Sequence, residues 1–553
     1  MNALVPLPVL LPLSATGLSL AFGTRLKRFQ RFISVAVLTV VLGLSAGLMA
    51  ATQSEGPLSV HLGDFAPPLG ITLVADRLSA LMLTVSSAVT LCVLVYSLGQ
   101  GMADRDEETP VAVFHPAYLI LVAGVSCTFL AGDLVNLYVG FEIMLVASFV
   151  LLTLGGTGPR VRAGSTYVII SLFSSMLFLT AIAMTYAAAG TANLAQLAQR
   201  LPGLPLGVQT LIQAMLLTVF AIKAAVFPLG AWLPDSYPTA PAPVTAVFAG
   251  LLTKVGVYSM LRTETLLFPG NRVGDLLMAV ALASMLVGIL GAVAQTDLKR
   301  LFSFTLISHI GYMIFGIGLA TRQSYGGAIV YVTHHITVQT TLFLVAGLVE
   351  RRGGTTELTR TGGLARAAPL LAVLYLVPAL NMAGIPPFSG FIGKLGLMRA
   401  GVADGSVWAW LLVAGSTATS LLTLYVMAKV WNLAFWRDAP PGQALDGTVL
   451  EADSDEDDDA ADADEGPDRM PGTGDEPVSH LPGPAGRAFA ATLHGRAITT
   501  TSRLPRTMVA ATAAGVLISL AFTVFAGPLT TYTDRTATEL LRRAPYIDEV
   551  LDR

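Results

Sequence analysis

The chain has 553 residues, of which 54% are hydrophobic and 12% are charged, about half the charged share of an ordinary soluble protein. This composition excludes a soluble globular protein, and a net charge of −3 gives no reason to expect nucleic acid as a partner. Apolar runs of about 20 residues recur along the chain, and each is long enough to cross a bilayer as a helix. The sequence therefore predicts an all-α polytopic membrane protein.

About fourteen transmembrane helices are predicted. In chain order they cover residues 3–22, 32–51, 78–99, 114–131, 134–154, 165–188, 208–230, 243–262, 273–294, 302–320, 327–349, 368–400, 407–434 and 507–527. The first run has no basic region before it, so we expect a helix and not a cleaved signal peptide. Pro228 lies near the end of span seven, and Pro386-Pro387 interrupts span twelve. Because proline removes a helical hydrogen bond and clashes with the preceding turn, spans seven and twelve are predicted to be broken helices.

Basic residues gather in the odd-numbered connections between the spans. These are Arg25, Lys27, Arg28, Arg31, Arg160, Arg162, Lys299, Arg300, Arg351, Arg352, Arg360 and Arg366. Cytoplasmic connections of membrane proteins carry an excess of Lys and Arg. We therefore expect the odd-numbered connections to be cytoplasmic and both termini to face the outside.

Two parts of the chain resemble each other. Asp133-Leu134, with Tyr138 after them, opens the fifth span, and Asp297-Leu298, with Phe302 after them, opens the tenth, about 160 residues later. Further matches follow in the same order at nearly the same offset. Because that offset covers five spans, an odd number, related helices must cross in opposite directions. This pattern predicts an inverted-topology repeat, a plan typical of secondary transporters.

Seven ionisable side chains lie inside the predicted spans. They are Glu142, Lys223, Lys254, His309, His334, His335 and Lys394. A charge at the bilayer centre costs roughly 2.5–3.5 kcal/mol on insertion scales, so such residues are rarely without a function. A series of them over six apolar segments indicates a route for protons or cations through the membrane.

Each of these residues also has a purely structural interpretation. Glu142 is either a protonated side chain bonded to a neighbouring helix or a proton-binding site tuned by a cation, and pairing with Lys223 would make a static ion pair or a switch. Lys254 lies near mid-span, which favours a relay over a lysine that snorkels to the interface. Lys394 follows the break of span twelve and is either an exit site or a packed interfacial lysine.

The three histidines lie on two neighbouring spans, between the two lysines 254 and 394. Imidazole has near-neutral proton affinity, and although a lone histidine is often a hydrogen-bonded core residue, three together favour a shared hydrated path. Because the adjacent His334 and His335 point to different helix faces, no metal site is predicted. Cys92 and Cys127 form no metal or disulfide pattern. No cofactor is predicted either.

Four motifs resemble a known family. They are the segments 132–144 (GDLVNLYVGFEIM), 221–237 (AIKAAVFPLGAWLPDSY), 250–258 (GLLTKVGVY) and 384–394 (GIPPFSGFIGK). They resemble the antiporter-like subunits shared by respiratory complex I and the multisubunit Mrp (Mnh) sodium/proton antiporters. The resemblance covers residues ~1–436 and the last span, and it is strongest to the D-type subunits, relatives of the proton-pumping M and N subunits of complex I.

The resemblance implies roles for four residues. Glu142 and Lys223 match the coupling ion pair of the family, Lys254 the central relay lysine and Lys394 the terminal one. Spans 4–8 and 9–13 match the two inverted five-helix units. The chain departs from the family at Gln339, where many members have a lysine four residues after the span-eleven histidine. We therefore expect the histidines, threonines and water to carry that part of the route.

Five regions are predicted on this basis. Residues 1–113 hold three N-terminal helices, 114–262 and 273–436 hold the two repeats, each expected to be a proton half-channel, and 504–553 hold the last helix and a tail. Residues 437–503 are acidic and rich in Pro and Gly, which predicts a disordered cytoplasmic insertion.

The resemblance predicts a secondary ion transporter subunit and not an enzyme. We expect the protein to lie in the bacterial plasma membrane, in a complex with A-, B-, C-, E-, F- and G-type Mrp subunits. This complex would exchange protons for Na⁺. The alternative is an M- or N-type subunit of complex I or of a related membrane hydrogenase, and neighbouring genes would discriminate between the two. A stand-alone solute transporter and an inert scaffold are the remaining possibilities.

Overall fold

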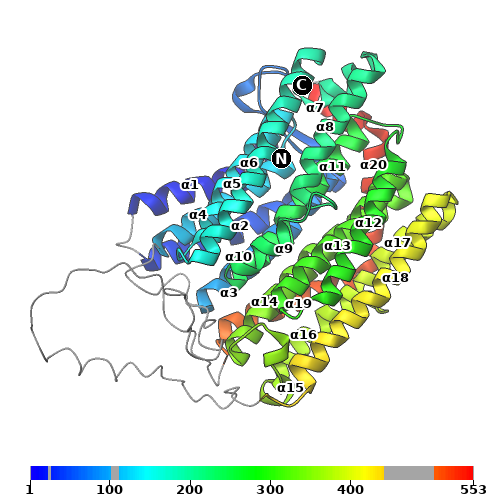
Figure 1. The fold of residues 1–553 in the computed structure, drawn as a ribbon. Coiled ribbons are helices and arrows are strands. Elements are labelled where there is room, and N and C mark those ends of the chain that lie inside the picture. Colours follow the sequence, from blue (N-terminus) through cyan, green and yellow to red (C-terminus); the bar gives the residue numbers. More distant parts are fainter. Residues whose placement is uncertain (1, 23–26, 101–110, 441–503, 552–553) are drawn as a thin grey trace, which may run out of the picture.

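The structure is a computed structural model that describes residues 2–22, 27–100, 111–440 and 504–551 (Figure 1). Within these ranges, 13 helices are long and apolar enough to cross a membrane. The broken pair α16 (Pro369–Ala383) and α17 (Ser389–Asp404) supplies the remaining predicted span. The all-α polytopic fold predicted from the sequence is therefore confirmed.

The elements follow one another in chain order. The first part of the chain contains η1 (Asn2–Leu4), α1 (Leu7–Phe22), α2 (Lys27–Ser54), β1 (Leu58–His61), η3 (Leu62–Asp64), β2 (Thr72–Ala75), α3 (Arg77–Gln100), α4 (Val111–Leu130), α5 (Leu134–Thr153), α6 (Gly158–Ala189), α7 (Leu194–Arg200), η4 (Leu201–Gly203) and α8 (Leu206–Ala224). The middle contains α9 (Leu233–Ser236), η5 (Tyr237–Thr239), α10 (Ala242–Val247), η6 (Phe248–Leu252), α11 (Thr253–Leu266), α12 (Gly274–Ala294), α13 (Leu298–Leu319) and α14 (Arg322–Gly353). The last part contains η7 (Leu358–Arg360), α15 (Leu364–Ala367), α16, α17, α18 (Val407–Val430), η8 (Trp431–Trp436), α19 (Arg506–Val524), α20 (Ala526–Arg542) and α21 (Ala544–Leu551).

The two predicted helix breaks are present. Helix α8 ends at Ala224, where Ala225 takes the left-handed conformation (φ 58°) ahead of Pro228. Helix α16 ends at Ala383, where Gly384 does the same (φ 83°), and Pro386 and Pro387 lie between it and α17. In both cases the chain leaves the helix through a left-handed residue and then meets a proline that cannot continue it.

The helices that begin after the two aspartates of the sequence repeat also make equivalent backbone hydrogen bonds at their starts. The Leu134 N–H donates to the Ala192 carbonyl, and the Leu298 N–H donates to the Thr356 carbonyl, both at 2.9 Å. Asp133 caps α5, and Asp297 caps α13, each accepting from a backbone N–H three residues on. The two helix starts are therefore built alike, as the sequence matches predict.

These starts lie at opposite ends of the molecule. Asp133 pairs with Asn193, just beyond the end of α6, whereas Arg300, three residues after Asp297, forms an ion pair with Asp235 close to where α6 begins. Helix α6 has 32 residues, which corresponds to about 48 Å. The opposite placement agrees with an inverted arrangement, and the boundaries of the five predicted regions remain a prediction.

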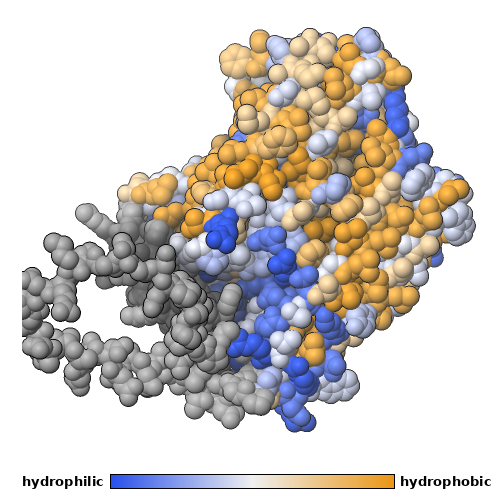
Figure 2. Space-filling model, viewed as in Figure 1, coloured by the Kyte–Doolittle hydropathy of each residue, from blue (hydrophilic) through white to orange (hydrophobic). Residues whose placement is uncertain are grey.

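We call the end of the molecule where α6 and α13 begin the basic face, because Arg160, Arg162, Lys299 and Arg300 lie there. Helix α15 lies near this end in Figure 1, whereas α7 lies at the other end. Figure 2 shows a broad hydrophobic surface over the rest of the visible side, with hydrophilic residues gathered toward the basic face. A hydrophobic belt of this kind is what a lipid-facing surface requires.

Helix α14 is the central element of the bundle. It is buried along its length and packs against α3, α10, α13, α16, α17, α19 and α20. Because residues 324–349 of α14 are buried in this packing, the polar residues of that stretch, including both of its histidines, are surrounded by protein. This placement brings them next to the helix break between α16 and α17.

The end opposite the basic face contains a feature that sequence patterns did not predict. Strands β1 and β2 form a small antiparallel hairpin in which Leu58 pairs with Ala75. Helix α21 packs against this hairpin and α7, and α20 packs against α3, α11 and α14. The C-terminal tail is therefore two docked helices. The predicted insertion, except for residues 437–440, lies outside the described residues.

Candidate functional site

Glu142 lies on α5 and accepts a hydrogen bond from the hydroxyl of Ser175 on α6. In the described part of the chain, no cation lies within ion-pairing distance of Glu142. Lys223 is nearby, with its Nζ 5.7 Å from the ring centroid of Phe141 and close enough to interact electrostatically with Glu142. The predicted pair is therefore brought together but not closed in this structure.

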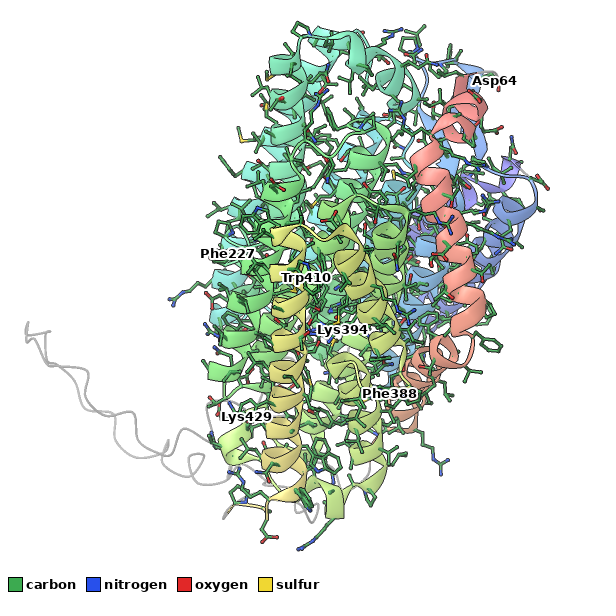
Figure 3. The ribbon with its side chains drawn as sticks, turned by 90° about the vertical axis from the view of Figure 1, so that its right-hand side faces the viewer. Asp64, Phe227, Phe388, Lys394, Trp410 and Lys429 are labelled. Carbon is green, nitrogen blue, oxygen red and sulfur yellow. The ribbon has the colours of Figure 1, made fainter. Side chains whose placement is uncertain are left out.

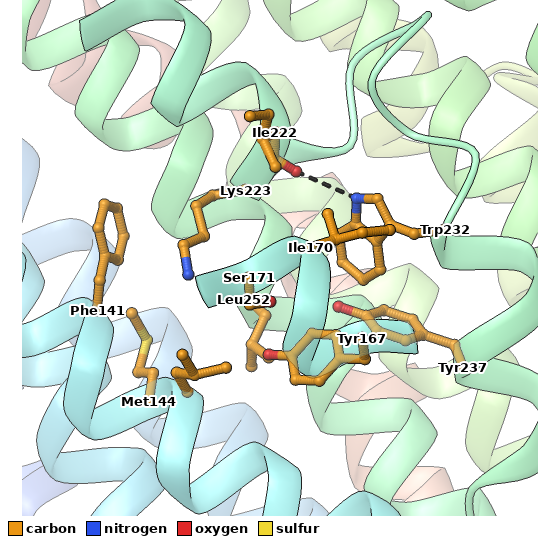
Figure 4. A pocket seen from close by; sticks show the side chains of 11 residues that line it. Phe141, Met144, Tyr167, Ile170, Ser171, Ile222, Lys223, Trp232, Tyr237 and Leu252 are labelled. Atoms are coloured by element: carbon orange, nitrogen blue, oxygen red, sulfur yellow. Dashed lines mark hydrogen bonds between the residues drawn. The ribbon is translucent and has the colours of Figure 1, made fainter. Parts of the chain in front are cut away.

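Lys223 lies in the last turn of α8, directly before the break. The Trp232 indole N–H donates to the Ile222 carbonyl at 3.3 Å, which ties the irregular stretch after the break back to the helix end. Figure 4 shows the Lys223 side chain pointing into a small cavity between α5, α6 and this stretch. The cavity has a volume of about 20 Å³, enough for a single water molecule.

Lys254 lies on α11, immediately after the π-helical turn η6. Its side chain is fully buried, and its Nζ donates to the carbonyl of Ala249, five residues earlier in that turn. Full burial excludes a lysine that snorkels to the membrane surface. π-Helical turns occur frequently at functional sites.

The histidines come together between α13, α14 and the second helix break. The Nδ1 of His309 lies 2.7 Å from the Tyr331 hydroxyl, and its ring centroid lies 5.4 Å from that of His335. The Nδ1 of His334 lies 3.1 Å from the hydroxyl of Ser389, the first residue of α17. His309 and His335 are within electrostatic reach of both Lys254 and Lys394. Helices α11, α13, α14 and α17 thus hold one group of neighbouring ionisable side chains.

Several buried polar atoms around these histidines have no hydrogen-bond partner among the described residues. They include both ring nitrogens of His335, Nε2 of His334, Oγ1 of Thr253, Oγ1 of Thr337, Oε1 of Gln339 and Nδ2 of Asn381. A buried polar group left unpaired costs about 1–3 kcal/mol, so such groups normally bind ordered water. The unpaired atoms therefore indicate water positions between Lys254 and Lys394.

Lys394 lies in the interior, between the end of the molecule marked by Asp64 and the end marked by Lys429 (Figure 3). Its Nζ donates to the carbonyls of Met382 and Ala383, at 3.1 and 3.0 Å, and lies 5.0 Å from the Tyr312 ring centroid. The helix break frees those two carbonyls, and the ammonium group binds them. Lys394 is buried, so it is not an interfacial lysine.

The close approach of α17 to the end of α16 requires a glycine. A Cβ on Gly390 would lie 2.0 Å from the Asn381 carbonyl oxygen and 2.9 Å from Cε1 of His334. The backbone N–H of Gly390 instead donates to the Asn381 side chain at 2.9 Å. The motif GIPPFSGFIGK thus builds the break that positions both His334 and Lys394.

A known family accounts for the part of the chain that carries this geometry. The family described as NADH:quinone oxidoreductase/Mrp antiporter, TM, matches residues 131–423, which is more than half of the chain. The chain belongs to this family. The matched range begins just before Glu142 and ends after Lys394, so it contains all seven ionisable residues of the site. The resemblance inferred from the motifs is confirmed.

Curated relatives within this family cover most of the chain. The D subunit of the Na⁺/H⁺ antiporter of Alkalihalophilus pseudofirmus is 40% identical over 440 residues, which is 79% of this chain and 87% of the relative. The protein of the same name from Bacillus subtilis is 34% identical over 439 residues, with the same coverage. The family match thus extends well beyond isolated motifs.

Solved structures share the fold over the whole chain. A chain of the Mrp complex from Dietzia sp. DQ12-45-1b superposes with a TM-score of 0.84 at 30% identity, covering 100% of both chains. A chain of respiratory complex I from Thermus thermophilus gives a TM-score of 0.73 at 24% identity, covering 97% of this chain and 99% of that one. At that lower identity, the likeness to complex I shows the fold alone.

Sequence reasoning missed several members of the site. Tyr331, Ser389 and Asn381 contact the histidines or the helix break, but each is a common residue type with no unusual spacing. Asn381 did carry a signal, because it occupies the position in the second repeat that Lys223 occupies in the first. Asp133 and Asp297 are helix caps. Glu264, another acidic residue near a helix end, is buried and accepts two hydrogen bonds from Gln213.

Proposed function

We propose that this chain is the proton-translocating subunit of a hetero-oligomeric monovalent cation/proton antiporter, with Na⁺ as the exchanged cation. The observation that supports this most directly is a series of ionisable side chains, which runs from the half-buried Glu142 and Lys223 to the buried Lys254, histidines and Lys394. Unpaired polar atoms line the part between Lys254 and Lys394. The names of the curated relatives supply the antiporter and its cation.

The proposed mechanism starts at the Glu142–Lys223 pair. In the open arrangement seen here, the carboxylate is held by Ser175, and the ammonium group faces a water-sized cavity. Closing the pair favours the charged form of both groups, whereas separating them favours release of a proton from the desolvated lysine. An alternation between open and closed pairs would therefore load and unload protons at Lys223.

The second part of the mechanism carries protons from Lys254 to Lys394. His309 and His335 lie between these lysines, and imidazole can accept a proton on one nitrogen while releasing one from the other. Gln339 cannot store a proton, but its Nε2 donates to the Phe302 carbonyl at 2.9 Å and leaves Oε1 free to hold water. We therefore assign this stretch to the histidines and bound water.

The proposed partners are the other subunits of an Mrp-type complex in a bacterial plasma membrane. The orientation proposed from the positive residues places the basic face in the cytoplasm. Both η1 and α21 contact β1, so the two ends of the described chain lie at the same end of the molecule. That agrees with an even number of spans and with both termini outside.

The test uses inverted vesicles from an antiporter-deficient host that expresses the whole gene cluster, with sodium-induced dissipation of the pH gradient as the signal. Glu142→Gln should abolish the signal while the subunits still co-purify. Glu55→Gln, the same change at an exposed residue outside the spans, should not. A wild-type rate in assembled Glu142→Gln would refute the proposed mechanism. Redox-driven pumping without a sodium response would instead identify a complex I–type subunit.

A further inference from the structure

A pocket opens on the basic face, next to the Lys223 cavity. It has a volume of about 500 Å³ and lies between the first turns of α6 and the α9–η5 segment. Its lining includes Arg162, Thr166, Asp235, Ser236 and Thr239. Arg162, Thr166 and Asp235 are exposed, so the pocket is open to solvent at the end of the molecule that carries the basic residues.

Only a thin layer separates this pocket from the internal cavity beside Lys223. Thr166 and Ser236 line the outer pocket, and the residues that follow them, Tyr167 and Tyr237, line the inner cavity. The Trp232 ring packs against both tyrosines, with its centroid 5.5 Å from that of Tyr167 and 5.7 Å from that of Tyr237. The same two segments thus form the wall of both spaces.

The hydroxyls in this layer differ in their hydrogen bonding. The Tyr167 hydroxyl lies 2.7 Å from the Ser148 hydroxyl. The Tyr237 hydroxyl and the Ser236 hydroxyl are buried, yet neither has a partner among the described residues. Because an unpaired buried hydroxyl is costly, and the adjoining cavity is large enough for one water, the layer is built to hold water next to Tyr237. Figure 4 shows Tyr237 beside Tyr167 on the wall of that cavity, across from Lys223.

We propose that the outer pocket is the mouth of the proton route to Lys223, and that the Tyr237 hydroxyl with a cavity water passes protons through the layer between the two spaces. The Tyr237 oxygen accepts a proton from a hydronium ion in the mouth, which is left as neutral water, and its own O–H proton passes to the cavity water as that O–H bond breaks. That water in turn delivers a proton to the neutral amine of Lys223. The tyrosine ends the step with the charge and proton count it had at the start, so no co-reactant is needed.

This inference rests on the proposed function, because it gives the proton route a specific opening. It assigns to Tyr237 a role that its packing does not require. The hydroxyl makes no hydrogen bond to the described residues, so removing it should leave stability unchanged. If Tyr237 had only a structural role, loss of its hydroxyl would therefore leave the transport rate unchanged as well.

The first experiment compares Tyr237→Phe with Tyr118→Phe in the assembled complex. Tyr118 is the matched control, since it is equally buried, lies on α4, and donates its hydroxyl to the Thr90 carbonyl at 2.8 Å. We expect the initial rate of sodium-dependent pH-gradient dissipation to fall about tenfold or more in Tyr237→Phe. Its thermal midpoint should match that of the wild type, and Tyr118→Phe should transport normally.

The second experiment plugs the mouth with a membrane-impermeant methanethiosulfonate applied to inverted vesicles. Thr166→Cys places the thiol in the pocket, whereas Ser165→Cys places it on the neighbouring exposed residue outside the pocket lining. We expect modification to block transport in Thr166→Cys and to leave Ser165→Cys and the wild type, with its native Cys92 and Cys127, unaffected.

The outcomes separate this inference from the function on which it rests. If Glu142→Gln transports at the wild-type rate, the proposed function fails first. If Glu142→Gln is inactive, but Tyr237→Phe or the plugged Thr166→Cys complex transports at the wild-type rate, the inference is overturned and the proposed function stands.

Discussion

The buried ion pair between Asp76 and Arg262 allows a stability prediction that does not depend on transport. Arg262, on α11, donates to both carboxylate oxygens of Asp76, at 2.6 and 2.8 Å, and both residues are almost fully buried. The guanidinium also lies over the rings of Tyr258 and Tyr546, 5.5 and 5.1 Å from their centroids. One cation thus holds together α3, α11 and the C-terminal helix α21.

Replacing Arg262 with Met should cost about 3–5 kcal/mol, because it leaves the Asp76 carboxylate buried without its cation. Burial by itself would raise the pKa of Asp76, but the Arg262 guanidinium outweighs it and holds that pKa below the usual range. Removing both charges with Asp76→Asn and Arg262→Met should recover most of the loss. The amide oxygen of the introduced asparagine would still accept from the Ser79 N–H, as the Asp76 carboxylate does at 2.9 Å.

The assay is unfolding of the purified complex, followed as a thermal midpoint, for both single variants and the double variant. Trypsin sensitivity of the C-terminal helices would be measured alongside, since Tyr546 should detach when Arg262 is lost. Arg366→Met is the matched control, because Arg366 pairs with Asp438 at 3.3 Å on the exposed surface and should contribute nothing measurable. A stability of Arg262→Met within about 1 kcal/mol of the wild type would refute the reasoning, as would a double variant no more stable than two additive losses.

Three further predictions concern the helix break and the C-terminal helices. Gly390→Ala should cost about 1–3 kcal/mol and abolish transport, because its Cβ would overlap a carbonyl oxygen at the end of α16; Gly396→Ala, on the same helix with its nearest contact at 3.4 Å, should retain both stability and transport. Lys394→Met should abolish sodium-dependent pH-gradient dissipation in an assembled complex, whereas Lys429→Met, which removes an ammonium group bound to carbonyls at the end of α12, should not. Burial and a neighbouring carboxylate raise the pKa of Glu539 to about 7, so docking of α20 is most stable at low pH and weakens as the pH rises through about 7. Tryptic cleavage of the C-terminal helices, normalised at each pH to cleavage of an unstructured reference peptide, should therefore be faster at pH 9 than at pH 6 in the wild type. That normalised difference should disappear in Glu539→Gln.

The fold was predictable because its determinants are local in sequence. Runs of apolar residues fix the spans, and Pro228 and Pro386 fix the two breaks, since each acts on its own helix whatever the neighbours are. The inverted repeat was also accessible, because Asp133 and Asp297 cap equivalent helices with equivalent hydrogen bonds. The short hairpin β1–β2 was not, because four-residue strands carry too few positions to show alternation.

The candidate site was predictable only in part. Ionisable residues inside apolar spans can be recognised from the sequence alone. The structure places His309, His334 and His335 close together, as expected. The partners of those residues come from distant helices and carry no sequence signal. Ser175 on Glu142 and Ser389 on His334 are examples, because a serine in a transmembrane helix is unremarkable until its neighbour is known.

The π-helical turn η6, beside Lys254, sets a limit on how this region can vary. A π-helical turn holds one more residue than an α-helical turn at the same position, and one residue corresponds to about 100° of rotation around a helix. The number of residues in η6 therefore sets the rotation of helix α11 (Thr253–Leu266) about its axis relative to α10. The five positions of η6 are tightly packed, because Phe248 is fully buried and a Cβ on Gly250 would clash with the Thr340 hydroxyl. Losing one of the five would also turn Lys254 and Arg262 away from their partners at once. Lineages of this chain should therefore reject single-residue insertions and deletions here.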